Sequence, residues 1–364
     1  MPPRAAECIL GSMYHQRFHF MRFAKAPPAG LPLQLSGAPA RELAPLLAQA
    51  NLTEADAPHR LREAIGRRYG VQTAQVVLCI GASQANALVA LAYLRAGDEV
   101  VVEAPTYEAL PGVAQWLGAK LVNVARRRER DWELDFGELE KAITARTRLV
   151  MLTSPNNPTG RPFGAAEIAR LRALSQKTGV AILVDEVYRD DLLEPPAVAV
   201  SGKVGTVLTT SSLTKVYGLS SLRLGWVLAP VSVAARLDEL TDWLHVVPPV
   251  PSVALALAAW PHLEAWREQQ RRAIAAAREV LEAWRERSGL LPGKIFDGMA
   301  FYLAQLPSAD DQGFCELMAQ AGVVIPAGSY FGAAGMARIG FGRLDPDRLG
   351  VALGAIELMS KTRL

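Results

Sequence analysis

The segment "RLVMLTSPNNPTGRPFGAAEIARLRALSQKTGVAILVDE", residues 148–186, contains two apolar runs separated by a helical pattern. Residues 148–154 and 180–186 are short and almost continuously apolar, which is typical of strands covered on both faces. Between them, residues 164–179 have the spacing of a helix that ends at Gly179. A strand, a helix and a second strand in this order favour a mostly parallel sheet.

Five further apolar runs of the same kind lie on either side of this segment. They occupy residues 76–80, 99–105, 120–125, 206–212 and 225–230. A second helical pattern, residues 83–97, lies between two of these runs and ends at Gly97. Strands and helices that alternate in this way predict an α/β fold, with a mostly parallel seven-stranded sheet flanked by helices.

The pattern changes after residue 230. Residues 260–289 predict one long helix, and residues 299–307 and 336–342 are strand-like. We expect a second, smaller α+β domain here, because a chain of 364 residues exceeds the size at which one hydrophobic core usually keeps growing. We predict that residues 41–245 form a large domain and residues 246–364 a small C-terminal domain. Residues 1–40 are predicted to be an N-terminal segment that joins the small domain.

The composition is that of a globular protein, with 50% hydrophobic and 21% charged residues. The 39 basic and 36 acidic residues leave a net charge of +3, and the densest basic run, residues 125–131, contains its own acids, so no nucleic-acid partner is expected. The three cysteines and five histidines lack the spacing of metal ligands, so no metal site is expected. No signal-peptide or membrane-spanning pattern is evident, and we expect a cytoplasmic protein without a membrane partner.

Polar residues lie at the ends of five of the predicted strands. They are GAS at 81–83, PTY at 105–107, SPNNPTG at 154–160, DEVY at 185–188 and SSLTK at 211–215. In an open parallel sheet, ligands bind at the carboxyl ends of the strands. We therefore expect these five groups to converge on one crevice.

Lys215 is the unusual member of this set, because it lies among serines, threonines and glycines with Arg223 eight residues later and no nearby acid. Desolvation and neighbouring positive charge favour a neutral amine, which can attack a carbonyl to form a Schiff base. Asp185 could pair with a protonated ring nitrogen, while Tyr188 and Asn157 could donate to a ring hydroxyl. A Schiff-base lysine and a carboxylate for a ring nitrogen are what pyridoxal 5'-phosphate (PLP) requires of a protein.

The remaining polar groups suit the phosphate of that cofactor. The N–H groups at the start of the helix after residue 80 can receive an anion, and an arginine can add a bidentate contact. The predicted phosphate-binding residues are Gly81, Ala82, Ser83, Ser212 and Arg223, and Tyr107 is predicted to stack on the ring.

The motifs "SPNNPTG", "DEVY" and "SLTKVYGLSSLRLGW" together resemble the signature of the class I/II aminotransferases, PLP enzymes of the aspartate aminotransferase fold. The resemblance extends from about residue 60 through "IPAGSYFG" (325–332) to "ARIGFG" (337–342). It is specific, because the order, the spacing and the neighbours of the motifs all agree.

The resemblance implies a role for each matched residue. Lys215 would be the Schiff-base lysine that also carries the proton, Asp185 would hold the ring nitrogen, and Tyr188 and Asn157 would hold the ring oxygen. Arg338 would bind the α-carboxylate of the substrate, with Asn157 and Gly37 close to that substrate. The resemblance also implies an L-amino acid and a 2-oxo acid as substrates, and a homodimer.

The chain departs from the family pattern at two places. Residues 51–64 lack the tyrosine that usually reaches the cofactor phosphate of the neighbouring subunit, and the turn at 325–332 is one residue longer. A PLP-dependent lyase, cyclase or decarboxylase on the same scaffold therefore stays open beside the aminotransferase. A non-catalytic binding module is a third alternative. Neither a G-x-G-x-x-G nor a G-x-x-x-x-G-K-[ST] motif is present for a dinucleotide or a nucleoside triphosphate.

Overall fold

A computed structural model describes residue 20, residues 30–191 and residues 206–363. Its main feature is a seven-stranded sheet in the order β2-β8-β7-β6-β5-β3-β4. The strands are β2 (Val76–Cys79), β3 (Glu99–Ala104), β4 (Lys120–Ala125), β5 (Thr147–Thr153), β6 (Ala181–Asp185), β7 (Thr206–Ser212) and β8 (Gly225–Leu228). All seven predicted strands are confirmed, as is the α/β fold class.

Six of the seven strands run in the same direction, and β8 alone is antiparallel to both of its neighbours. The reason is the short connection from β7 to β8, which holds no crossover helix and so returns the chain antiparallel. Gly225 begins β8 where the chain packs closely, because an added Cβ would lie 2.6 Å from the carbonyl carbon of Gly81.

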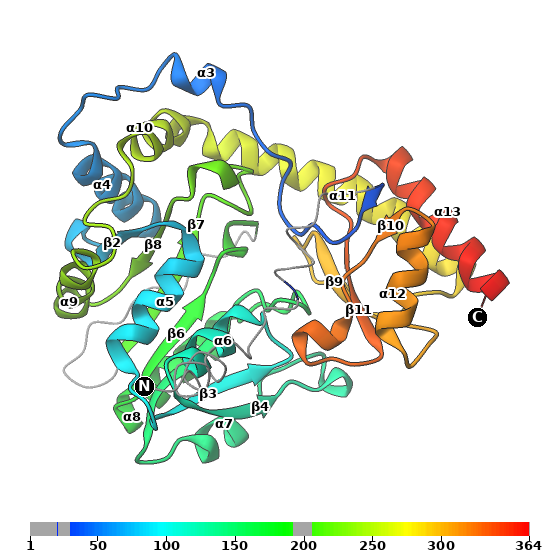
Figure 1. The fold of residues 1–364 in the computed structure, drawn as a ribbon, viewed down its shortest axis with the longest axis horizontal. Helices are drawn as coiled ribbons and strands as arrows, with labels where there is room; N and C mark the ends of the chain where they lie inside the picture. Colours follow the sequence, from blue (N-terminus) through cyan, green and yellow to red (C-terminus); the bar gives the residue numbers. More distant parts are fainter. Residues whose placement is uncertain (1–19, 21–29, 192–205, 364) are drawn as a thin grey trace, which may run out of the picture.

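Helices cover both faces of this sheet (Figure 1). The helices of this part are α3 (Ala44–Leu47), α4 (Ala57–Tyr69), α5 (Gly81–Tyr93), α6 (Ala109–Trp116), α7 (Phe136–Ala142), α8 (Ala165–Thr178), α9 (Val231–Thr241) and α10 (Val250–Ala259). Side chains of α5, α6 and α9 form one buried cluster with the sheet. On the other face, α8 packs into a second cluster. A third cluster contains side chains of α4 and α10 packed against β2 and β8. The near-continuous apolar strands are buried for this reason.

The predicted helix ends are confirmed at Gly179, which follows α8 with a left-handed φ of 73°. The helix predicted to end at Gly97 stops earlier, at Tyr93. Leu94 has an extended backbone there, and the Arg95 N–H donates to Asp98 Oδ2 at 2.7 Å, so a turn replaces the last helical residues.

A smaller group of elements lies on one side of the sheet, with the long helix α11 running between the two parts (Figure 1). It comprises α11 (Leu263–Ser288), β9 (Phe301–Gln305), α12 (Asp311–Gln320), β10 (Val323–Val324), β11 (Met336–Gly340) and α13 (Pro346–Arg363). β9 pairs with β11, and β10 pairs with β1 (Leu31–Pro32) from the N-terminal part of the chain. We propose a division of the chain at residues 40 and 245. The helix α10, which follows residue 245, packs against β2 and β8 of the large sheet.

Short 3-10 helices connect several of these elements. They are η1 (Thr73–Gln75), η2 (Arg128–Arg130), η3 (Arg189–Asp191), η4 (Ser220–Leu222), η5 (Trp260–His262) and η6 (Gly328–Phe331). Within the described ranges, no helix is both long and apolar enough to cross a membrane.

We predict that two of the three cysteines resist alkylation in the folded protein. Cys79 and Cys315 are buried, and burial raises the pKa of each thiol to about 12. At pH 8 only about one such thiol in ten thousand would be the reactive thiolate. Peptide mapping after iodoacetamide treatment should find both residues unmodified in the native protein and modified in urea. Equal labelling in the two conditions would contradict the burial of these side chains.

Candidate active site

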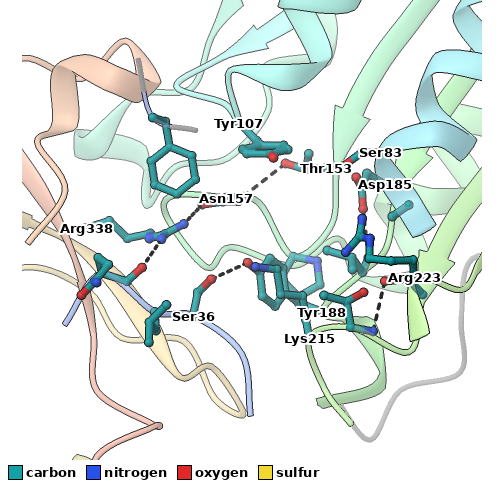
Figure 2. A pocket seen from close by; sticks show the side chains of 18 residues that line it. Ser36, Ser83, Tyr107, Thr153, Asn157, Asp185, Tyr188, Lys215, Arg223 and Arg338 are labelled. Atoms are coloured by element: carbon teal, nitrogen blue, oxygen red, sulfur yellow. Dashed lines mark hydrogen bonds between the residues drawn. The ribbon is translucent and has the colours of Figure 1, made fainter. Parts of the chain in front are cut away.

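One cavity lies at the carboxyl ends of the sheet strands and is also lined from the N-terminal part and from β11. Ten of the predicted site residues line it, so the expected convergence on one crevice is observed (Figure 2). They are Ala82, Ser83, Tyr107, Asn157, Asp185, Tyr188, Ser212, Lys215, Arg223 and Arg338. The other two, Gly37 and Gly81, lie next to cavity-lining residues. A Cβ added at Gly37 would lie 2.9 Å from the Lys215 carbonyl oxygen, and one added at Gly81 would lie 2.8 Å from Arg223 Nη2.

Asp185 is the last residue of β6, lines the cavity and is only 5% exposed. The Asn86 side-chain amide donates to its Oδ2 at 2.6 Å, and the Val187 N–H donates to its Oδ1 at 3.0 Å. Burial raises the pKa of Asp185, while these two donors and the Lys215 charge act against that shift. The carboxylate is therefore held in place and would gain from a cationic partner.

Asn86 is a residue that the sequence analysis missed. It lies on α5 and is 4% exposed, and its Oδ1 accepts from the Thr210 hydroxyl at 2.6 Å. The amide group is thereby fixed with its donor toward Asp185. A polar side chain on the apolar face of a predicted helix was the feature that could have revealed it.

Arg338, on β11, is the most deeply buried charged group of the cavity, with 1% exposure. Its guanidinium donates to Asn157 Oδ1 and to the Gln34 carbonyl oxygen, both at 2.7 Å, while Nε has no hydrogen-bond partner in the part of the chain that the structure describes. Three aromatic rings surround it, with centroids 5.0 to 5.6 Å from the guanidinium carbon: Phe20, Phe301 and Phe331.

Among the described residues no carboxylate forms an ion pair with Arg338. Burial lowers the pKa of its guanidinium, which nevertheless stays charged because its ordinary value is so high. A buried cation without a carboxylate partner is costly unless a ligand supplies the anion. Arg338 is therefore suited to bind a carboxylate that enters the cavity.

A second anion-binding region lies where α5 begins. Gly81 has a left-handed φ of 77°, and the Arg223 guanidinium occupies the space that a Cβ at position 81 would need. The free N–H groups of the first turn of α5 and the Arg223 charge both favour an anion here. Ser83, Ser212 and Arg223 line the same end of the cavity.

Tyr107 lines the cavity beside this region, and its ring stands edge-on to Phe20 with centroids 5.9 Å apart. Burial raises the pKa of its hydroxyl to about 12, against the opposing effects of Arg338 and a hydrogen bond with Ser83. The group therefore stays a neutral phenol at physiological pH and presents an aromatic surface to a ligand.

The donor set fits PLP. Anion-binding groups for a phosphate lie at Arg223 and the start of α5, and a buried carboxylate for a ring nitrogen is present at Asp185. Lys215 lines the same cavity, and Gly81 leaves the room that Arg223 needs. Arg338 lines the same cavity and is not needed for any of these contacts.

A buried ion pair behind the cavity supports the 154–160 loop, and sequence reasoning missed it. Glu103 Oε2 accepts from Arg126 Nε at 2.7 Å, and both side chains are fully buried. Glu103 Oε1 accepts from the Thr153 N–H, the Thr153 hydroxyl and the Asn156 amide at 2.6 to 2.8 Å. Asn156 in turn accepts from Thr159, so the loop that carries Asn157 is held from within.

We predict that Glu103→Ala destabilises the protein by about 3–5 kcal/mol, because it leaves the Arg126 guanidinium buried without its carboxylate. Urea unfolding should measure this loss. Arg130→Ala is the matched control, since Arg130 pairs with Asp135 at the exposed surface and its removal should change stability little. Similar losses in both variants would contradict the assignment.

The family model "Aminotransferase class I and II" matches residues 48–356. Arginine–pyruvate transaminase AruH from Pseudomonas aeruginosa is 32% identical over 315 residues, which are 84% of this chain and 77% of that protein. A histidinol-phosphate aminotransferase from Granulibacter bethesdensis is 33% identical over 226 residues, which are 61% of this chain and 59% of that protein. The chain therefore spans less than two thirds of the length of this second relative.

A solved PLP-dependent aminotransferase from Streptococcus suis has the same fold, with a TM-score of 0.84 at 22% identity, covering 96% of this chain and 98% of that one. The chain belongs to the class I and II aminotransferase family. The predicted resemblance, fold and PLP cofactor are thereby confirmed. The two relatives named above are aminotransferases, which favours an aminotransferase over the lyase, cyclase and decarboxylase alternatives.

Proposed function

We propose that the protein is an aminotransferase that exchanges the amino group of an L-amino acid with a 2-oxo acid and uses Lys215 as its covalent anchor for PLP. The observation that carries the proposal is the buried Arg338, which no described carboxylate neutralises, in the same cavity as Lys215 and Asp185. This arrangement suits an amino acid whose carboxylate is bound by Arg338 while its α-carbon reacts near Lys215.

PLP, when bound, supplies an aldehyde for amines and a ring that withdraws electrons from the substrate α-carbon. The residues that would hold it fall into four groups. The phosphate would lie on Gly81, Ala82, Ser83, Ser212 and Arg223, the ring nitrogen on Asp185, the ring oxygen on Tyr188 and Asn157, and the ring face on Tyr107.

Side chains of the protein bind the substrate, stabilise charge and transfer the proton. Arg338 binds the substrate carboxylate and sets its orientation, with Asn157 fixed beside it and Gly37 on the adjoining segment. Asp185, whose burial disfavours an isolated negative charge, stabilises a positive charge on the group that it faces. Lys215 Nζ takes the proton from the substrate α-carbon as a general base and later donates this proton as a general acid.

The direct test incubates the PLP-loaded protein with L-amino acids and 2-oxoglutarate. Formation of glutamate supports transamination. Release of ammonia or pyruvate without an acceptor would instead support a lyase and contradict the proposal.

We predict that Lys215→Ala lowers kcat by a factor of about 10²–10⁴ or more, because both the covalent anchor and the proton carrier are lost. Borohydride treatment, which traps a lysine–aldehyde linkage, should fix the cofactor to the wild type and not to the variant. Lys177→Ala is the control, since that lysine pairs with Glu140 at the surface. Full turnover of Lys215→Ala would refute the role of Lys215.

We predict that Arg338→Lys lowers kcat/KM for the amino acid by a factor of about 10–150, because a lysine replaces two charge-assisted hydrogen bonds with one point charge. Steady-state kinetics over several amino donors should find a similar loss for all of them. Arg272→Lys, at an exposed pair with Glu268, should leave the kinetics unchanged. A loss confined to one donor would mean that Arg338 binds a side chain and not the common carboxylate.

We also propose a homodimer in the cytoplasm. The connection between α9 and α10 exposes large apolar side chains, with Trp243 87%, Val246 64% and Val247 50% exposed. Apolar side chains grouped in this way favour an interface. Light scattering should find a dimer for the wild type, and a monomer for Trp243→Glu combined with Val247→Glu. Trp116→Glu, an exposed tryptophan on α6, should stay dimeric.

A further inference from the structure

Residues 34–38, here called the crossing segment, lie against three of the residues to which a function is proposed. The Gln34 carbonyl oxygen accepts from Arg338 at 2.7 Å, the Ser36 and Tyr188 hydroxyls are hydrogen-bonded at 2.6 Å, and the Ala38 N–H donates to the Lys215 carbonyl oxygen at 2.7 Å. Every second residue of the segment thus contacts one part of the site.

Only the middle contact is made by a side chain of the crossing segment. Ser36 is 4% exposed and Tyr188 is 2% exposed, and both line the cavity (Figure 2). The Tyr188 ring is itself held by Phe301, with ring centroids 4.8 Å apart. The two hydroxyls therefore meet in a fixed and desolvated geometry, where a hydrogen bond has its largest effect.

The direction of this hydrogen bond decides what Tyr188 can do. A hydroxyl has one proton, so a Tyr188 that donates to Ser36 cannot donate into the cavity. A Ser36 that donates to Tyr188 Oη leaves the tyrosine proton free and also makes Tyr188 a stronger donor. Only the second direction agrees with a Tyr188 that holds the ring oxygen of the cofactor.

The backbone around Ser36 is held independently of its hydroxyl. The Gly340 N–H donates to the Leu33 carbonyl oxygen at 2.7 Å on one side, and the Arg41 N–H donates to the Gly218 carbonyl oxygen at 3.0 Å on the other. Gly37 lies so close to Lys215 that a Cβ would be 3.2 Å from the Lys215 Cδ. Removal of the Ser36 hydroxyl should therefore leave the path of the crossing segment unchanged.

We propose that Ser36 is a positioning residue that donates its proton to Tyr188 Oη and so directs the Tyr188 proton into the cavity. The proposal rests on the function proposed above. A hydrogen bond from Tyr188 would withdraw negative charge from the ring oxygen of bound PLP, and that charge would otherwise help to retain a proton on the nitrogen between Lys215 and the cofactor. Without Ser36, Tyr188 would be a weaker donor, and this nitrogen would keep its proton to a higher pH. Asp185, Lys215, Arg223 and Arg338, the charged groups that line the cavity, are unchanged by a substitution at Ser36.

The experiment follows the absorbance of the bound cofactor as a function of pH in the PLP-loaded protein. For Ser36→Ala we expect the midpoint of the titration to rise by about half a unit to one unit. Ser36→Thr, which keeps the hydroxyl, should titrate close to the wild type. Near-equal thermal unfolding midpoints of the three proteins would establish that the fold is intact.

A double-mutant cycle separates action through Tyr188 from a general effect on the site. In a Tyr188→Phe background, Ser36→Ala should cause no further shift of the midpoint. An unchanged midpoint in Ser36→Ala, or an equal shift in both backgrounds, would overturn the assignment of Ser36. Failure of the wild type to form the PLP absorbance band would instead overturn the proposed function, and the role of Ser36 with it.

Discussion

The common direction of six strands is the constraint on which the site depends. Parallel strands end at one edge of the sheet, so the polar residues that follow them meet there although they are far apart in the chain. Asp185 ends β6, Lys215 follows β7 and Asn157 follows β5. The apolar strands behind Asp185 keep water away from its carboxylate, which strengthens the electrostatic interactions of that group.

The molecule contains two kinds of buried charge, and they differ in their partners. Glu103 and Arg126 neutralise each other within the fold and hold a loop in place. Arg338 and Asp185 are also buried, but among the described residues their hydrogen-bond partners are amide groups and backbone atoms, and neither forms an ion pair. A buried ion pair such as Glu103–Arg126 holds neighbouring segments in place, whereas a buried charge without an opposite charge reduces the stability of the fold and is suited to bind a ligand. This difference marks the cavity as a functional site more clearly than its shape does.

The N-terminal part of the chain belongs to the site as much as the sheet does. Leu31 and Pro32 pair with β10, after which the chain passes Arg338, Tyr188 and Lys215 before it reaches α3. Its backbone carries two of these contacts, so they depend on the path of the chain more than on the identity of the side chains. Gly37 is the exception, because only a residue without a Cβ allows the segment to approach Lys215 so closely.

The sequence by itself determined the seven strands, the fold class and ten of the residues that line the cavity. Apolar runs set which segments are buried, and the local motifs around Asn157, Asp185 and Lys215 are specific enough to identify their chemistry.

Only the tertiary structure decided which polar groups meet. Ser36 and Tyr188 are 152 residues apart, Asn86 and Asp185 are 99 apart, and Gln34 and Arg338 are 304 apart. Hydrophobic periodicity says that a residue is buried, but it carries no information on its partner, because a hydrogen bond depends on the path of two distant backbones to within a few tenths of an ångström. The reversed direction of β8 and the early end of α5 were decided in the same way, by a short connection and a local turn.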